Sequence, residues 1–431
     1  MDFAPDTTTR DITGRVRDFL ADEVLPAEPV LAAQVAATPG DWSFRPVVRD
    51  LQAAARERGL WNLFLPPGGP DGPGGPAAER GGGLTNLQYA PVAELTGYSP
   101  KLAPVAMNCA APDTGNMELL AHFATPQQRE RWLDPLLEGE QRSAFCMTEP
   151  AVASSDATNI ATRIVRDGDE YVVTGRKWFA TGAMNPGCGL LVVMGKTDPG
   201  AARHRQQSMV LVPRDTPGVT VVRGLTVLGY DDRDHGGHAE IVFDDVRVPA
   251  ANLLGGEGDG FAMAQARLGP GRIHHCMRAL GTAERALDLV RERAADRVAF
   301  GAPLADQGVV REWVATSRIE IESLRLLVLK TAWLMDTVGN KAAMTEIQAI
   351  KIALPRAVGQ ILDRAVQVFG AAGVSGDHPL AELLAGVRTL RLADGPDEVH
   401  LASLGRAELR RRAPYLARVA PELSTVEGDP T

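Results

Sequence analysis

Four short stretches of sequence decide the fold class: EYVVTG (170–175), GLLVVMG (189–195), SMVLVP (208–213) and AEIVF (239–243). Each stretch is rich in Val, Leu, Ile or aromatic residues, and Gly, Pro, Asp and Asn separate the stretches from one another. Short runs of this kind between turn-forming residues are typical of β-strands. The sequence therefore predicts a small, mostly antiparallel β domain over residues 143–256.

The region before these strands, residues 1–142, has a helical pattern. Apolar residues recur at three- and four-residue spacing around Val16, Phe19 and Leu20, which favours amphipathic helices. The stretch PPGGPDGPGGPAAERGGG (66–83) interrupts the pattern and is expected to form a loop.

The helical pattern returns in the region after the strands, residues 257–431. One helical stripe is expected to contain Ile273, Met277, Leu280, Leu287 and Val290. Further helices are expected over 311–336 and 342–370, and a last one after 394–400. The order of helices, strands and helices predicts an α+β protein.

The composition excludes several classes of protein. The chain has 431 residues and a formal net charge of −9, which argues against nucleic acid as a partner because such partners require a basic face. No apolar run is long enough for a membrane span, and the first residues do not resemble a signal peptide. The four cysteines lie far apart in the sequence, so we expect neither a disulfide framework nor a zinc site. A cytoplasmic location fits these features.

Six motifs occur in an order that resembles the acyl-CoA dehydrogenase family, and the resemblance runs from about residue 85 to 410. They are FCMTEPAVASSD (145–156), RKWFATGA (176–183), FDDVRVPAANLLGGEGDGF (243–261), DRVAFG (296–301), QVFGAAG (367–373) and LADGPDEVH (392–400). The last motif and LGPGRIHHCMR (268–278) look most like the subgroup that vertebrates fuse to a phosphotransferase-like kinase domain. The resemblance implies an N-terminal helical domain, a middle β domain and a C-terminal four-helix bundle.

The resemblance also implies FAD as the cofactor, bound without a dinucleotide-binding fingerprint, because GGEGDG (255–260) follows a loop and is expected to be a turn. The residues matched to cofactor contacts are Phe145, Met147, Thr148, Ser155, Trp178, Phe179, Ala180, Thr181, Arg297, Phe300, Gln307, Gln367, Gly370 and Glu398. Those matched to substrate contacts are Ser155, Arg272 and Gly395. In the family, the residues matched by Arg297 and Gln367 reach the FAD of a neighbouring subunit, which implies a homodimer or homotetramer.

Several positions depart from the usual family pattern. Family members normally bring a Ser or Thr hydroxyl to flavin N5 at the position of Ala180, whereas here the hydroxyl follows at Thr181. Either Thr181 replaces that contact or only a backbone N–H reaches N5. Gly308 stands where the family often has Gln, with Gln307 beside it, and Pro396 replaces a common hydroxyl residue. One extra residue precedes Ser155 within its motif.

Asp394 is the residue that we expect to remove the α-proton of an acyl-CoA thioester. The chemistry needs a carboxylate in a water-poor pocket, and the family usually has Glu followed by Gly where this chain has Asp394 and Gly395. Some relatives carry the base at the position of Gly271, which cannot serve here. The alternative role for Asp394 is to cap the last helix.

His274, His275 and Cys276 look like a metal-binding cluster, but consecutive helical positions point about 100° apart and cannot converge on one ion. We expect one of the two histidines to line the acyl pocket and the other to belong to the core. His235 and His238 are expected to be loop residues before a strand.

The predicted function is α,β-dehydrogenation of an acyl-CoA in fatty acid metabolism, with an electron-transferring flavoprotein as the electron acceptor. One alternative is a flavin oxidase or monooxygenase on the same scaffold, similar to nitroalkane oxidases or to N-hydroxylating relatives. The other is a helical scaffold that has lost its flavin.

Overall fold

The computed structural model describes residues 4–67 and 80–411. The N-terminal part is helical, and its helices are α1 (Thr7–Phe19), α2 (Leu25–Ala37), α3 (Pro46–Glu57), α5 (Asn86–Thr96), α6 (Ala103–Ala106), α7 (Asp113–Phe123), α8 (Pro126–Gln128) and α9 (Asp134–Leu137). Val16, Phe19 and Leu20 are buried, as their spacing predicts. Of the expected loop over 66–83, residues 68–79 lie outside the described part, and its described ends contain no helix or strand.

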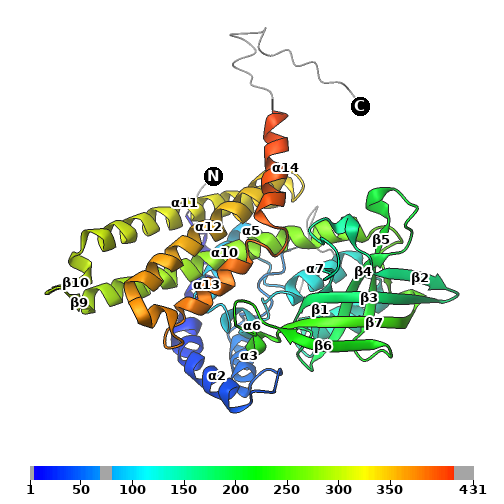
Figure 1. Ribbon diagram of the computed structural model, residues 1–431, viewed down its shortest axis with the longest axis horizontal. Coiled ribbons are helices and arrows are strands. Elements are labelled where there is room, and N and C mark those ends of the chain that lie inside the picture. The colour runs from blue at the N-terminus through cyan, green and yellow to red at the C-terminus, as the bar shows by residue number, and fades with distance from the viewer. Residues whose placement is uncertain (1–3, 68–79, 412–431) are drawn as a thin grey trace, which may run out of the picture.

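The middle part is a β-sheet that lies at one end of the molecule (Figure 1). Its strands are β1 (Arg142–Cys146), β2 (Arg163–Asp167), β3 (Glu170–Thr181), β4 (Cys188–Lys196), β5 (Gln207–Pro213), β6 (Val219–Leu225), β7 (His238–Pro249) and β8 (Leu253–Leu254). Their order in the sheet is β6-β7-β3-β2-β4-β5-β8, with β1 paired to β4. The β3–β7, β2–β3, β4–β5, β5–β8 and β6–β7 pairs are antiparallel, whereas β1 runs parallel to β4. The predicted mostly antiparallel sheet is therefore confirmed.

The C-terminal part is again helical. It comprises α10 (Gly260–Asp296), the short hairpin of β9 (Val298–Ala299) and β10 (Ala302–Pro303), α11 (Gly308–Val338), α12 (Met344–Phe369), α13 (Leu380–Thr389) and α14 (Asp397–Leu409). The expected helices differ from α11 and α12 by only a few residues at each end. Figure 1 shows α10 to α13 packed beside one another and α14 projecting from them. The α+β class and the order of its parts are confirmed.

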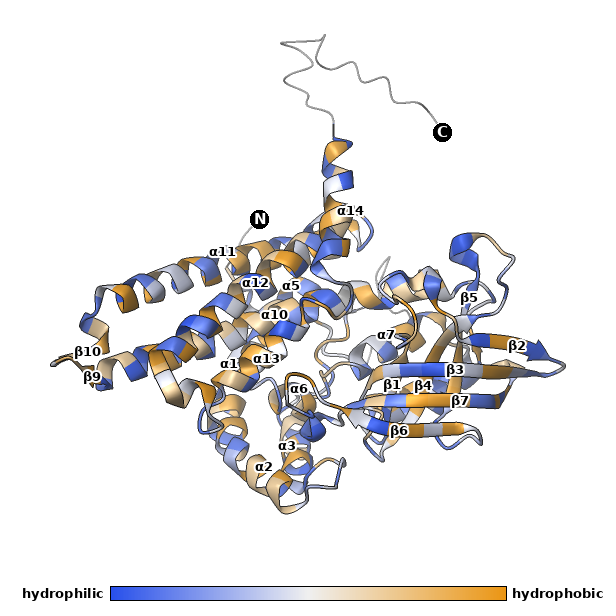
Figure 2. Ribbon diagram, in the orientation of Figure 1, coloured by the Kyte–Doolittle hydropathy of each residue, from blue (hydrophilic) through white to orange (hydrophobic). Residues whose placement is uncertain are grey.

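The helices of the C-terminal part bury one face each. On α10, the predicted stripe is confirmed because Ile273, Met277, Leu280, Leu287 and Val290 are all buried. On α12, the buried residues Ile347, Ile350, Leu354, Val358 and Ile361 follow helical spacing, and polar and apolar residues alternate along the helix in Figure 2. Among the described residues, no helix is both long and apolar enough to cross a membrane.

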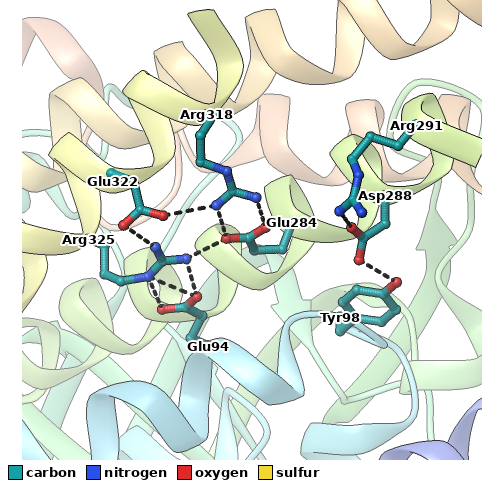
Figure 3. Close-up of polar contacts among 8 residues, drawn as sticks. All are labelled: Glu94, Tyr98, Glu284, Asp288, Arg291, Arg318, Glu322 and Arg325. Carbon is teal, nitrogen blue, oxygen red and sulfur yellow. Dashed lines mark hydrogen bonds and ion pairs between the residues drawn. The ribbon is translucent and has the colours of Figure 1, made fainter. Parts of the chain in front are cut away.

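An ion-pair network joins helices α5, α10 and α11 (Figure 3). The guanidinium of Arg325 on α11 contacts Glu94 on α5 at 2.7 Å and Glu284 on α10 at 2.5 Å. Glu284 also binds Arg318 at 2.7 Å. These half-buried contacts fix α10 against its neighbours, and α10 carries several residues of the site described next.

Candidate active site

The first two motifs with cofactor residues meet where the chain leaves β1 and where β3 ends. The backbone N–H of Trp178 on β3 donates to the carbonyl oxygen of Thr148, just after β1, at 3.0 Å. The ammonium group of Lys177 lies beneath this contact and donates to the carbonyl of Met147 at 2.9 Å and to Glu149 at 2.8 Å. The structure therefore brings the two motifs together through two of the predicted contacts, Thr148 and Trp178, and through residues beside them.

The ion pair of Glu149 and Lys177 is buried and fully hydrogen-bonded on the carboxylate side. Besides Lys177, Glu149 accepts the backbone N–H groups of Ala161 at 2.8 Å and of Thr162 at 2.9 Å. Burial lowers the pKa of Lys177, and Glu149 opposes that shift, while Lys177 and these donors hold the pKa of Glu149 below its ordinary value. A buried pair with these additional bonds holds its two segments rigidly.

Trp178 carries a hydrogen-bond donor that its protein surroundings leave unused. Its indole Nε1 is buried and has no acceptor among the described residues, a situation that is rare in folded proteins. The ring packs edge-to-face on Phe179 with 5.0 Å between ring centres, and Phe179 itself is 41% exposed. An exposed aromatic residue beside an unused buried donor fits a site for an aromatic cofactor with polar edges.

The other predicted residues of these motifs lie around this point. Phe145 and Met147 are half-buried, Thr148 and Ser155 are exposed, and Ala180 is fully buried. The Thr181 hydroxyl lies 2.9 Å from Nδ1 of His238.

The expectation that His238 is a loop residue was wrong, because His238 is the first residue of β7 and pairs with Thr181 in the sheet. His235 lies outside the strands, as expected, in a short 3-10 turn.

Asp394 lies between α13 and α14 and in contact with α10. Its φ of 55° is left-handed, and Gly395 follows with a φ of 103°, a conformation that glycine adopts without strain. The backbone carbonyl of Asp394 accepts a hydrogen bond from Nε of Arg272 at 3.0 Å and lies 3.2 Å from Nε2 of His400. Since α14 begins at Asp397 and its N-cap position, Pro396, offers no side-chain cap, Asp394 does not cap that helix.

The carboxyl group of Asp394 faces α10 at a position where that helix has no side chain. A Cβ built on Gly271 would lie 3.7 Å from its Oδ2 atom, and Nε2 of His275 lies 3.8 Å from the same atom. Burial lowers the pKa of His275 to about 4, so this imidazole is neutral at neutral pH. Of the two neighbouring histidines, His275 thus faces the predicted base, while His274 packs on Phe64 and Tyr89 in the core.

Cationic side chains from two helices surround Asp394. Lys351 on α12 donates to the carbonyls of Leu390 and, at 3.4 Å, of Gly395. Burial lowers the pKa of Arg272 and of Lys351, and in each case the Asp394 carboxylate opposes that shift. The predicted base therefore lies in a partly dehydrated region of positive potential, which is suited to stabilising negative charge on a bound reactant.

Arg267 on α10 connects the two halves of the site. Its guanidinium stacks on the ring of Phe145 at 4.0 Å and donates to Asn116 on α7 at 2.9 Å. Burial lowers its pKa, and Asp394 is the first of the charges that oppose this shift. The sequence reasoning missed Arg267, Lys351 and His400. Of these three residues, only Arg267 has a signal in the sequence. It lies one helical turn before Gly271, so both residues share one face of α10, the face that turns toward Asp394.

A further set of predicted cofactor residues is not brought to this site. Arg297 and Phe300 lie at the β9–β10 hairpin, at the end of the molecule opposite the β-sheet (Figure 1). Phe300 is 103% exposed, and Gln367 and Gly370, at the end of α12, are exposed as well. Gln307, before α11, is half-buried, and Glu398 is exposed in the first turn of α14.

All four cysteines are buried and free in the structure. Within the part of the chain that the structure describes, no group of three or more His, Cys, Asp or Glu residues could hold a metal ion.

The order of helical, β-sheet and helical parts is that of the flavin-dependent dehydrogenases. Family models describe the match in three parts: the acyl-CoA dehydrogenase N-terminal domain over 6–140, the middle domain over 144–246 and the C-terminal domain over 258–409. The chain belongs to the acyl-CoA dehydrogenase family, and the enzymes of this family use FAD.

Two curated relatives and one solved structure illustrate the relationship. The chain is 57% identical to FadE2 of Mycobacterium tuberculosis, described as a probable acyl-CoA dehydrogenase, over 95% of this chain and 98% of that protein. It is 50% identical to acyl-CoA dehydrogenase family member 11 of Rattus norvegicus, over 96% of this chain but only 52% of that longer protein. A Mycobacterium abscessus structure described as that of a putative acyl-CoA dehydrogenase has a TM-score of 0.89 and 48% identity, covering 96% of this chain and 100% of that one.

Proposed function

We propose that this enzyme oxidises an acyl-CoA thioester to its 2-enoyl-CoA and that Asp394 removes the α-proton. FAD, when bound, supplies the acceptor for the hydride from the β-carbon. The observation that carries the proposal is the position of the Asp394 carboxyl group, which faces Gly271 and lies within electrostatic reach of Arg267, Arg272 and Lys351.

The role of each residue follows from its contacts. Arg272 and His400 hold the backbone carbonyl of Asp394, so they orient the carboxylate without neutralising it directly. The neutral imidazole of His275, at 3.8 Å from Oδ2, is close enough to exchange a proton with Asp394 after a small side-chain rotation. We further propose that Gly395 and Arg272 contact the substrate, whose thioester oxygen needs donors as negative charge develops on it.

The FAD-binding residues that we propose within one subunit are Phe145, Met147, Thr148, Ser155, Trp178, Phe179, Ala180 and Thr181. Support comes from the backbone hydrogen bond between Trp178 and Thr148 and from the unused donor of Trp178. A denatured extract of the yellow protein should contain FAD, and an extract with FMN alone would contradict this assignment.

We further propose that the protein is a homodimer or homotetramer in which Arg297, Phe300, Gln307, Gln367 and Gly370 complete the FAD site of a neighbouring subunit. The guanidinium of Arg297 makes no hydrogen bond or ion pair within residues 4–67 and 80–411, and Phe300 is exposed. A second observation is an apolar stripe at seven-residue spacing on α11, with Ile319 66%, Leu326 48% and Trp333 37% exposed. A second copy of the chain is the natural partner for such a stripe.

The remaining parts of the proposal rest on the sequence. They are an electron-transferring flavoprotein as acceptor, a role in fatty acid metabolism, a cytoplasmic location, a contact of Glu398 with FAD, and domain limits at 1–142, 143–256 and 257–431. Buried free cysteines fit a reducing compartment.

Anaerobic mixing with a panel of acyl-CoA thioesters tests the reaction directly. Bleaching of the flavin by at least one thioester, followed by slow reoxidation in air and fast reoxidation by an electron-transferring flavoprotein, is the expected result. Bleaching by nitroalkanes or amines, or reoxidation by O₂ at the rate of turnover, would replace dehydrogenation with an oxidase or monooxygenase reaction. A colourless protein that refuses FAD would support the scaffold alternative.

A further inference from the structure

Thr181, whose hydroxyl follows the family's usual hydroxyl position by one residue, is the first member of a short polar chain. Its Oγ1 atom lies 2.9 Å from Nδ1 of His238. The other ring nitrogen of His238, Nε2, lies 3.5 Å from Oδ2 of Asp232. The three side chains therefore form a line of hydroxyl, imidazole and carboxylate at the edge of the candidate cofactor region.

The backbone fixes all three members of this line. Thr181 and His238 are directly paired at the ends of β3 and β7. The carbonyl of Asp232 accepts the N–H groups of Gly237 at 2.9 Å and of His235 at 3.0 Å, so the turn before β7 holds Asp232 near the ring. The side chain of His238 is only 19% exposed and that of Asp232 is 31% exposed, so water competes weakly for the imidazole.

The line has one consistent arrangement of protons at neutral pH. Burial is the largest influence on the pKa of His238 and lowers it. Asp232 raises that pKa and His235 lowers it, both by smaller amounts. A neutral imidazole has one N–H and one acceptor nitrogen. The carboxylate of Asp232 accepts only, so it favours the N–H on Nε2, which leaves Nδ1 as the acceptor of the Thr181 hydroxyl proton. Because a hydroxyl has a single proton, Thr181 then offers only lone pairs to any other group.

We propose that His238 is a positioning residue that fixes Thr181 as a hydrogen-bond acceptor toward the flavin, so that the site prefers the reduced cofactor, which carries an additional N–H. The inference rests on the proposed function only in placing Thr181 at the flavin nitrogen that gains this hydrogen. A free hydroxyl could instead donate its proton to the same nitrogen in oxidised FAD. His238 removes that option and thus favours the state of the enzyme that has just received the substrate's electrons.

Redox titration of the FAD-loaded enzyme tests the inference with four proteins: the unmodified chain, His238→Phe, Thr181→Val and the double variant. One hydrogen bond of about 1 kcal/mol corresponds to roughly a fivefold change in the ratio of affinities for reduced and oxidised FAD. Each single variant should lower that ratio about fivefold, a fall of about 20 mV in the two-electron potential. The double variant should equal the single variants, because His238 acts through Thr181.

Asp232→Asn provides a check that leaves the ring in place. It removes the carboxylate that fixes the tautomer, so it should also lower the ratio, and ¹⁵N spectra of histidine-labelled protein should show His238 changing from the Nε2–H form. A purely structural role for His238 would lower FAD content without changing the potential of the FAD that remains bound.

Unchanged potentials in the single variants, additive effects in the double variant, or an Nδ1–H form in the unmodified protein would each overturn the inference. The titration needs no acyl-CoA, so its outcome is separate from that of the proposed reaction. If acyl-CoA bleaches the flavin but the variants leave the FAD potential unchanged, only the inference about His238 is contradicted. If the FAD potential shifts as expected but no acyl-CoA reduces the flavin, only the proposed reaction is contradicted.

Discussion

Nε of Arg272 donates to the backbone carbonyl oxygen of Asp394 at 3.0 Å and so joins helix α10 to the turn that carries the predicted base. The turn needs such support because Asp394 has a left-handed φ of 55°, which is unusual for a residue other than glycine. The hydrogen bond therefore fixes where the carboxylate points.

Arg272→Lys tests this relationship. Lysine keeps the charge but cannot reproduce the planar donor of arginine, so we expect flavin reduction by acyl-CoA to slow about tenfold, as for the loss of one charge-assisted hydrogen bond, with unchanged FAD content. The control is Arg291→Lys on the exposed end of the same helix, whose side chain is 59% exposed and which should behave as the unmodified enzyme. Equal rates for the two variants would contradict a role of Arg272 in orienting Asp394.

Lys177→Met tests the buried ion pair beneath the cofactor segments. Removal of one partner leaves the Glu149 carboxylate buried without its charge partner, which costs about 3–5 kcal/mol of stability. The double variant Lys177→Met with Glu149→Gln should recover part of that loss of stability. The single and the double variant should both retain less FAD than the unmodified protein. Thermal unfolding and bound flavin per subunit are the measurements. Arg163→Met, an exposed change on β2, is the control, and equal losses in it and in Lys177→Met would contradict the account.

Arg297→Ala tests the shared cofactor site. Because Arg297 is exposed and has no ion pair among the described residues, its loss should change the unfolding temperature little but weaken FAD binding about tenfold or more. Mixed oligomers of Arg297→Ala and Asp394→Asn subunits should recover activity at limiting FAD, since one site then combines an intact Asp394 with an intact partner Arg297. No recovery, or an active flavin-loaded monomer in sedimentation, would contradict the shared site.

Arg325→Met tests the network that holds α10. Its contacts with Glu94 and Glu284 are half-buried, so we expect a loss of about 1–2 kcal/mol at pH 7. Hydrogen bonds from Arg318 and Arg325 hold the pKa of Glu284 below its ordinary value, against burial. The contribution of Glu284 is therefore complete above the unfolded pKa of about 4.3 and is lost as the pH falls through the lower folded value.

The difference in unfolding temperature between Arg325→Met and the unmodified protein should thus narrow below about pH 4. Arg291→Met breaks a more exposed pair with Asp288, whose side chains are 59% and 40% exposed, and should change stability by less than about 0.5 kcal/mol at any pH. A difference for Arg325→Met that is constant between pH 7 and pH 3 would contradict the role of the network.

Local pattern was sufficient to predict the elements of this fold. The spacing of Ile273, Met277 and Leu280 predicted the buried face of α10, and β-rich runs between turn residues predicted the sheet. Asp394 could be selected from its motif because the family places a carboxylate before that glycine.

The surroundings of Asp394 could not be predicted in the same way. Arg267 and Lys351 lie on different helices, and in the sequence each looks like a solvated charge on an amphipathic helix. Only tertiary packing places them beside Asp394. His238 was misplaced in a loop because the register of β3 against β7, which pairs it with Thr181, depends on two strands far apart in the sequence.

The most direct test of the central claim is rapid-mixing flavin reduction by a good acyl-CoA substrate in Asp394→Asn and Asp394→Glu. Asparagine preserves size but cannot accept the proton, so its rate should fall at least about 10²-fold while FAD and acyl-CoA still bind. Glutamate keeps the carboxylate and moves it by about one bond length, so it should keep partial activity. An Asp394→Asn enzyme that is nearly fully active, with Asp394→Glu the more damaged of the two, would show that Asp394 is not the base.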